Sequence, residues 1–112
     1  MYIMKIQPEY FNMVKERKKS IEVKLLDEKR KMFKVGDTIL LKKEPELFDG
    51  VVIRITEIKY FNTFLEMAQR LSIKELGFEG KSATEVNDIY HNIYTIEDEV
   101  KYGVVAMKFE LL

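Results

Sequence analysis

The order of strand-like and helix-like segments is the feature that most limits the fold of this chain. Five segments are rich in β-favouring residues or alternate between apolar and polar side chains; they cover residues 2–6, 20–26, 38–42, 51–60 and 104–112. One helix signal follows the first segment, and several lie between the last two. Strands and helices therefore do not alternate as they do in a doubly wound parallel sheet. We predict an α+β fold, in which a small, mixed, mostly antiparallel sheet is curled into a β-barrel with helices packed on one side.

Local signals predict where the helices begin. Pro8 suits the first turn of a helix that runs to about Arg17, because a missing N–H costs nothing there. Three later segments have Ser or Thr three residues before Glu, the pattern of a capping box: Thr63–Glu66, Ser72–Glu75 and Ser82–Glu85. The second of these ends quickly at Gly77. We predict a helix start at each of these positions.

Other segments are predicted to be loops or turns. Residues 27–31 are a run of charges typical of a solvated loop, and Gly36-Asp37 is a turn pair that admits positive φ. Residues 95–101 are predicted to be a polar turn. The alternation of the fourth strand slips near Glu57-Ile58, which indicates a bulge or bend of the kind that closes small barrels.

Length and charge limit the size of the protein and the kind of partner it binds. The chain has 112 residues, of which 46% are hydrophobic and 34% are charged, and its formal net charge is zero. These values predict one globular domain, residues 1–112, with a core of its own. Zero net charge disfavours avid, non-specific binding to nucleic acid, which needs many unopposed cations. It leaves room for a small basic surface.

The residue types that are absent or rare exclude several kinds of site. The chain has no cysteine, which excludes disulfides and thiolate metal sites. Its single histidine, His91, cannot make a histidine-rich metal site, although carboxylates could still bind hard cations. We expect no metal and no cofactor. No apolar run approaches the roughly 18–20 residues that a membrane span needs, and the apolar run at the N-terminus is too short for a signal peptide. We therefore expect a cytoplasmic protein with no membrane partner, and the oligomeric state stays open.

The stretch from Arg17 to Lys24 concentrates the candidate chemistry. Four cations and one carboxylate fall within these eight residues. Strand alternation separates an apolar from a polar face: Ile21, Val23 and Leu25 lie on one, and Ser20, Glu22 and Lys24 on the other. Lys19 shares the numbering parity of the apolar face. Its side chain must therefore either precede the alternating part of the strand or point into the mouth of the barrel.

This stretch resembles the signature of ASCH domains, a branch of the PUA-like superfamily, usually written G-x-K-x-x-E-x-R. Lys19 and Glu22 match the lysine and the glutamate, whereas Arg17 stands where glycine is usual and Lys24 where arginine is usual. Residues 33–39 are similar to the K-x-G-D segment that leads into a strand in the family. Residues 77–80 and 102–105 resemble bacterial members with a long helical insertion.

The resemblance implies a PUA-like barrel with a cleft beside the signature, proposed for the family to bind RNA or nucleotides. Our first hypothesis is therefore a domain that binds RNA, a nucleotide or a modified nucleoside. In such a site Lys19 and Lys24 would meet anionic oxygens, and Glu22 would accept hydrogen bonds from the base or the ribose. Tyr60 and Phe61, at the end of the long strand, would line the cleft and stack on a base.

An alternative function is a hydrolase that uses the same cleft, either an amidohydrolase on an N4-acylated cytidine or a ribonuclease. Some small bacterial members resemble amidohydrolases of N4-acetylcytidine, which use a lysine, a threonine nucleophile and a glutamate. By position these correspond to Lys19, Glu22 and the neighbourhood of Glu79, with a carboxylate in place of the threonine. Because an ionised carboxylate is a poor acyl acceptor, Glu22 would instead activate water.

Each candidate residue also has a structural interpretation. Lys19 and Glu22 can form an ion pair that orders the start of the strand, and Glu79 can be a solvated residue of a loop flanked by glycines. Tyr90 and Tyr94 belong to an apolar helix face, so we interpret them as core rather than as stacking platforms. A protein-interaction module that keeps the fold without a ligand is the third functional hypothesis.

Overall fold

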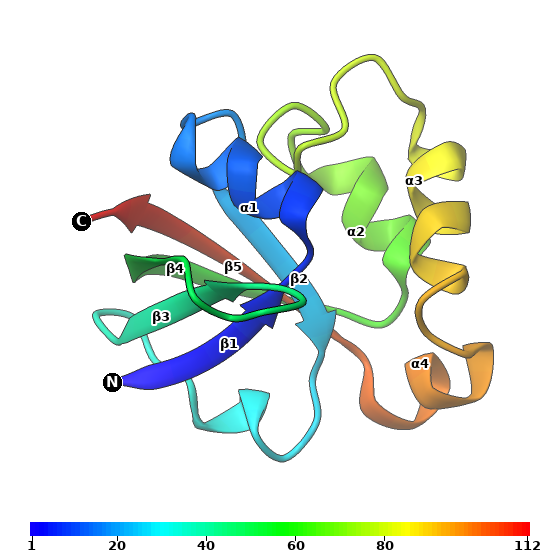
Figure 1. Ribbon diagram of the computed structural model, residues 1–112. Helices are drawn as coiled ribbons and strands as arrows, with labels where there is room; N and C mark the ends of the chain where they lie inside the picture. Colours follow the sequence, from blue (N-terminus) through cyan, green and yellow to red (C-terminus); the bar gives the residue numbers. More distant parts are fainter.

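Five strands form one curved, open sheet (Figure 1). The computed structural model describes residues 1–112, the whole chain. The strands are β1 (Tyr2–Ile6), β2 (Ile21–Leu25), β3 (Thr38–Lys43), β4 (Gly50–Phe61) and β5 (Val104–Leu111). They lie in the order β1-β3-β4-β5-β2, and only the β1–β3 pair is parallel. The predicted α+β class and the mixed, mostly antiparallel sheet are confirmed.

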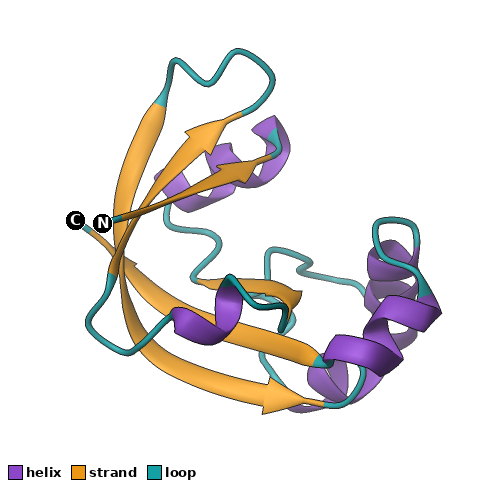
Figure 2. Ribbon diagram, turned by 90° about the horizontal axis from the view of Figure 1, so that it is seen from below, coloured by secondary structure: helices purple, strands orange, loops and turns teal.

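The barrel is open along one side. Strands β1 and β2 are the two edges of the sheet and do not pair with each other. Figure 2 shows the sheet curving into a half-barrel. Strand β4 makes the curvature possible, because its pairing register with β5 shifts between Ile55 and Glu57. This irregularity lies within two residues of the predicted bulge, and it turns the second half of β4 away from β3 toward the helices.

Four α-helices accompany the sheet: α1 (Pro8–Lys15), α2 (Phe64–Arg70), α3 (Ala83–His91) and α4 (Ile96–Tyr102). A short 3₁₀ turn covers Arg30–Met32. The capping signals before α2 and α3 are confirmed, since the hydroxyls of Thr63 and Ser82 each accept an N–H from the third helical residue at 3.1 Å. None of the helices has the length and apolar character needed to cross a membrane.

Two local predictions were wrong. Residues 95–101 were predicted to be a turn, yet they lie mostly in helix α4, whose N-cap Thr95 accepts the Asp98 N–H at 3.1 Å. Its apolar residues are exposed, so no buried stripe marked it as a helix. The start at Ser72 makes its cap bond to Glu75, but only turns follow before the chain reverses at Gly77, where φ is +93°.

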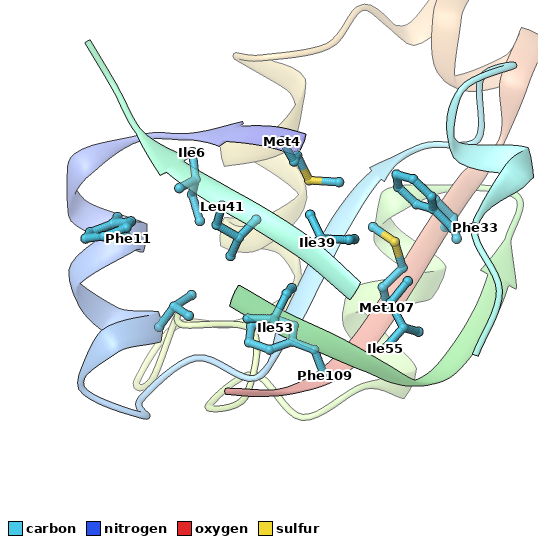
Figure 3. Close-up of a cluster of buried hydrophobic side chains, with 12 residues drawn as sticks. Met4, Ile6, Phe11, Phe33, Ile39, Leu41, Ile53, Ile55, Met107 and Phe109 are labelled. Carbon is cyan, nitrogen blue, oxygen red and sulfur yellow. The ribbon is translucent and has the colours of Figure 1, made fainter. Parts of the chain in front are cut away.

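Strand β5 is buried on both faces, and this divides the core into two clusters. The first lies between the sheet and α1 and includes Val105 and Met107 (Figure 3). The second contains Val104 and Ala106 and joins β2 to α2 and α3. Helices α2 and α3 therefore pack on the face of β5 opposite to the first cluster, which refines the expectation of helices on one side only.

A buried carboxylate holds α4 to the start of α2. Glu99 is only 4% exposed. One of its oxygens accepts the backbone N–H of Phe64 at 2.7 Å, and the other lies 3.0 Å from Nε2 of His91. His91, whose side chain is 26% exposed, lies at the edge of the core and orients this carboxylate.

Candidate functional site

A pocket of about 220 Å³ lies between the end of β1, strand β2 and the end of α3. Three residues predicted from the signature, Lys19, Glu22 and Lys24, line it together. Ten further residues complete the wall: Lys5, Ile6, Gln7, Tyr10, Val23, Glu44, Phe78, Tyr90, Ile93 and Tyr94. The opening between the two edges of the half-barrel is therefore lined by charged and aromatic side chains.

The end of helix α1 decides where Lys19 points. Arg17 has a left-handed backbone with φ of +63°. The N–H groups of Arg17 and Lys18 donate to the carbonyls of Val14 and Met13 at 3.0 and 2.8 Å, the paired bonds of a Schellman motif. Lys19 follows this reversal and precedes the first residue of β2. Lys19 therefore precedes the alternating part of the strand, which was the first of the two positions that its numbering parity allowed.

The ammonium group of Lys19 is enclosed by backbone oxygens and aromatic rings. The residue is 3% exposed. Its Nζ donates to the carbonyls of Ile21 and Leu76, both at 2.7 Å, and lies 5.6 Å from the ring centre of Tyr10 and 5.9 Å from that of Phe78. An ammonium has three N–H groups, so one donor is left for another partner.

Lys19 and Glu22 share the pocket without forming an ion pair. Burial lowers the pKa of Lys19 because the ammonium loses its hydration, while the carboxylate of Glu22 opposes this shift. No nitrogen–oxygen contact within 4.0 Å joins the two groups, so the direct ion pair considered above is not formed. Glu22 is 8% exposed, and its Oε1 accepts the N–H of Val23 at 3.1 Å. Its Oε2 has no protein donor, which leaves an acceptor free in the pocket.

The free edge of β2 adds a main-chain acceptor. Ser20 and Leu26 bond to the chain on the β5 side, so alternation turns the peptide groups of Ile21 and Val23 toward the open edge. The Ile21 carbonyl accepts from Lys19, and the Val23 N–H is bonded to the preceding carboxylate. The Val23 carbonyl is the next group along this edge, and no protein group donates to it.

Three tyrosines border the same space. Burial raises the pKa of Tyr10, and raises that of Tyr90 well above 10.0, with the nearby Glu22 carboxylate acting in the same direction on both. Tyr90 and Tyr94 stack on Phe64, with ring centres 4.8 and 5.5 Å apart. None of the three phenol groups has a protein hydrogen-bond partner. Tyr90, on α3, and Tyr94, in the turn after it, therefore pack in the core and also line the pocket.

Three of the predicted site residues lie elsewhere. Glu79 lines a separate hollow beside Arg17 and Lys18. Phe78 lines the pocket, whereas Glu79, the next residue in the same loop, lines the separate hollow. On β4, Tyr60 is 60% exposed and Phe61 packs on the second core cluster. Neither aromatic lines the pocket; the aromatic residues that do line it are Tyr10, Phe78, Tyr90 and Tyr94.

The sequence pointed only weakly to these additional residues. Tyr90 and Tyr94 were predicted to share one helix face, but α3 ends at His91, so only Tyr90 is helical. Nothing in their spacing showed that both would reach a pocket. Lys5 and Glu44 belong to segments distant from the signature; the β1–β3 pairing brings these two segments side by side, and the curved sheet places both residues at the pocket. No three histidine, aspartate or glutamate side chains gather as metal ligands would.

The fold and the site together define a PUA-like half-barrel with a lysine–glutamate pocket at its open edge. The chain belongs to the ASCH domain family, whose sequence model matches residues 4–112. The resemblance to this family that the sequence indicated is thereby confirmed.

Several solved structures share this architecture. Hypothetical protein PH0355 is 34% identical, with a TM-score of 0.88 over 99% of this chain and 98% of that one. Protein PF0455 from Pyrococcus furiosus is also 34% identical, with a TM-score of 0.75 over 99% and 96%. An ASCH domain from Lactobacillus crispatus, at 16% identity, shares the fold with a TM-score of 0.67 over 98% and 79%. Among curated proteins, none matches this chain in sequence.

Proposed function

We propose that this ASCH domain binds one unstacked nucleotide unit, as part of RNA or as a free nucleotide or modified nucleoside, in the pocket beside β2. The observation that carries the proposal is the meeting of a buried amine and a buried carboxylate, Lys19 and Glu22, with four aromatic rings around one pocket. The second carboxylate oxygen of Glu22 and the tyrosine hydroxyls have no protein partner, so these groups are free to bind a polar, planar ligand.

The size of the pocket suits a single base. Its volume of about 220 Å³ lies below the range of roughly 300–1,000 Å³ that is typical of pockets for drug-sized ligands. Sequence-specific recognition of RNA mostly targets single-stranded bases that are splayed out and stacked on aromatic side chains. A base with its sugar at the mouth fits this description better than two stacked bases.

The polar groups match the edge of a base. The third N–H of the Lys19 ammonium donates to a carbonyl or ring nitrogen of the ligand. Glu22 Oε2 and the Val23 carbonyl accept from its amino or imino groups. The phenol of Tyr90 is protonated at neutral pH, as any tyrosine is, and serves as a second donor.

Isothermal titration calorimetry with the four common ribonucleosides, N4-acetylcytidine and short single-stranded RNAs tests the proposal. We expect binding to at least one probe, and Glu22→Gln to weaken it about tenfold through loss of a charged acceptor. Glu79→Gln is the matched control, since it makes the same change outside the pocket. No binding to any probe, or equal effects of the two variants, would overturn the proposal in favour of a protein-interaction module.

A second candidate function is hydrolysis at the same pocket, favoured by the free oxygen of Glu22 near an amine of lowered pKa. On an N4-acylated cytidine, Glu22 takes a proton from water while the oxygen attacks the acyl carbonyl, and Lys19 stabilises the oxyanion. The C–N bond then breaks, the proton passes to N4, and a carboxylic acid leaves. Glu79 has no part in this scheme because it lies outside the pocket.

Product analysis decides between binding and hydrolysis. Incubation with N4-acetylcytidine, followed by chromatography, yields cytidine if the protein is an amidohydrolase. Incubation with single-stranded RNA yields shortened products if it is a ribonuclease. Loss of either activity in Glu22→Gln, but not in Glu79→Gln, assigns it to the pocket. Intact substrates after prolonged incubation at high protein concentration leave binding as the function.

A further inference from the structure

Two lysines stand on opposite walls of the pocket, and neither is neutralised. Lys5 comes from β1 and Lys24 from β2, the two edges of the half-barrel. Neither amine has a carboxylate oxygen within 4.0 Å, although Glu22 and Glu44 line the same pocket. Because β1 and β2 do not pair, no strand fills the space between the two amines.

The charges of the pocket separate into an inner and an outer group. Three lysines and two glutamates line it, which gives a net charge of +1 in a chain whose net charge is zero. The inner group is Lys19 and Glu22, both buried and of opposite charge. The outer group consists of Lys5, Lys24 and Glu44, which are partly or fully exposed. The excess positive charge therefore lies at the mouth.

We propose that Lys5 and Lys24 together form a phosphate subsite at the mouth of the pocket, so that the ligand is a nucleotide rather than an uncharged nucleoside. This inference rests on the proposed function, because the base must enter the inner part of the pocket. Lysine binds phosphate as a point charge on a flexible stem. Two lysines approaching from different strands therefore tolerate the range of positions that a sugar allows its phosphate. The negative charge of Glu44 repels the phosphate. Removing a lysine should therefore weaken phosphate binding, and removing the charge of Glu44 should strengthen it.

The first test compares ligands that differ only in a phosphate. The four ribonucleosides and their 5′-monophosphates are titrated into the full chain at low salt. For the preferred base, we expect the monophosphate to bind about tenfold more tightly, as a charge-assisted contact predicts. This preference should shrink as salt is raised. A short single-stranded RNA distinguishes the sources of the phosphate: tighter binding than the monophosphate assigns it to an RNA chain, and equal or weaker binding to a free nucleotide.

The second test assigns the preference to residues. Lys5→Gln and Lys24→Gln should each reduce the ratio of monophosphate to nucleoside affinity several-fold, and Glu44→Gln should increase it. Lys34→Gln is the matched control, because it removes the same charge from an exposed lysine outside the pocket. Thermal unfolding verifies that each variant is folded.

The outcomes separate this inference from the function on which it rests. Equal affinity for nucleoside and monophosphate, with Glu22→Gln still weakening both, overturns the phosphate subsite and leaves the base pocket standing. A preference that survives both lysine changes also overturns the subsite. Absence of binding by every probe overturns both proposals.

Discussion

The ammonium of Lys19 donates a 2.7 Å hydrogen bond to the carbonyl of Leu76, a residue 57 positions further along the chain. A second bond of equal length reaches the carbonyl of Ile21. The same side chain therefore ties the start of β2 to the loop before α3 and presents its remaining donor to the pocket. Lys19 thus both stabilises the fold and lines the pocket, so its substitution should affect stability as well as ligand binding.

Replacing Lys19 by methionine should destabilise the protein. The change keeps an unbranched side chain but leaves two buried carbonyls without donors, which costs about 3 kcal/mol in the free energy of unfolding. Urea denaturation measures this loss. Lys18→Met is the control, because the side chain of Lys18 is 72% exposed. A Lys19→Met variant as stable as the wild type would show that the buried hydrogen bonds contribute nothing.

The stability of the wild type should depend on pH through Lys19. Burial lowers its pKa in the folded state below the ordinary value of 10.5. Between these two values the unfolded chain binds more protons than the folded one, so the free energy of unfolding rises with pH across that window. Denaturation curves of wild type and Lys19→Met, recorded at several alkaline pH values, isolate the effect. The difference between them should grow as the pH approaches 10.5; a constant difference would contradict the buried ammonium.

Tyr90 should oppose this trend at higher pH. Burial raises its pKa well above 10.0, so the folded state holds its proton after the unfolded state has released it. Stability from this group is present below about pH 10 and is lost as the pH rises further. Tyr90→Phe should flatten the alkaline loss of stability, whereas Tyr60→Phe changes a residue that is 60% exposed and serves as control. Tyrosinate absorbance during alkaline titration of the folded protein checks the order of ionisation.

Gly77 and Gly80 form a matched pair for the loop that carries Leu76. Both have positive φ, +93° and +87°. A Cβ on Gly77 would lie 3.1 Å from Sδ of Met13 and 3.3 Å from Cδ of Lys19, whereas one on Gly80 would meet nothing within 4 Å. Gly80→Ala should therefore cost about 1 kcal/mol of backbone strain, and Gly77→Ala should cost more and also weaken ligand binding. Equal losses of stability in the two variants would show that Met13 and Lys19 can move away from the added methyl group at no cost.

Arg17→Gly should stabilise the protein. Arg17 adopts a left-handed backbone at the end of α1, with φ of +63°, which costs a residue with a side chain about 1–2 kcal/mol relative to glycine. The substitution also restores the residue that is usual at this position of the ASCH signature. Part of the gain is offset, because glycine makes the unfolded chain more flexible, and a net gain of about 0.5–1 kcal/mol is expected. Thermal unfolding that shifts downward instead would indicate that the arginine side chain has a stabilising contact.

The regular elements could be predicted because their signals are local. Strands β1 to β5 and the caps of α2 and α3 follow from alternation, β-branched residues and capping hydroxyls, each of which acts over a few residues. Helix α4 was missed because its apolar residues Ile96 and Val100 face solvent. Its stability comes from tertiary contacts, above all from buried Glu99, rather than from a buried stripe of its own.

Around the pocket, Lys19, Glu22 and Lys24 could be predicted from the sequence because they are close in the chain, on one short strand and just before it. Glu79, Tyr60 and Phe61 could not be placed correctly. Which side of a loop a residue faces, and which side of a strand meets a helix, depends on packing between distant segments. Phe78 faces the pocket, and the pocket is lined by Tyr90 of α3 and by Tyr94, which follows that helix, rather than by the aromatic residues of β4.

The sequence by itself determined the strands and most of the helices, the mixed α+β class, and the presence of an amine and a carboxylate at the start of β2. These features depend on neighbouring residues and on periodicity. Only the tertiary structure decided that β1 and β2 stay unpaired, that the gap between them is lined by residues of six different segments, and that Lys19 is buried without a partner carboxylate within 4.0 Å. The physical reason is that a pocket is the space left between packed elements, so the local sequence of one element cannot predict its position or its lining.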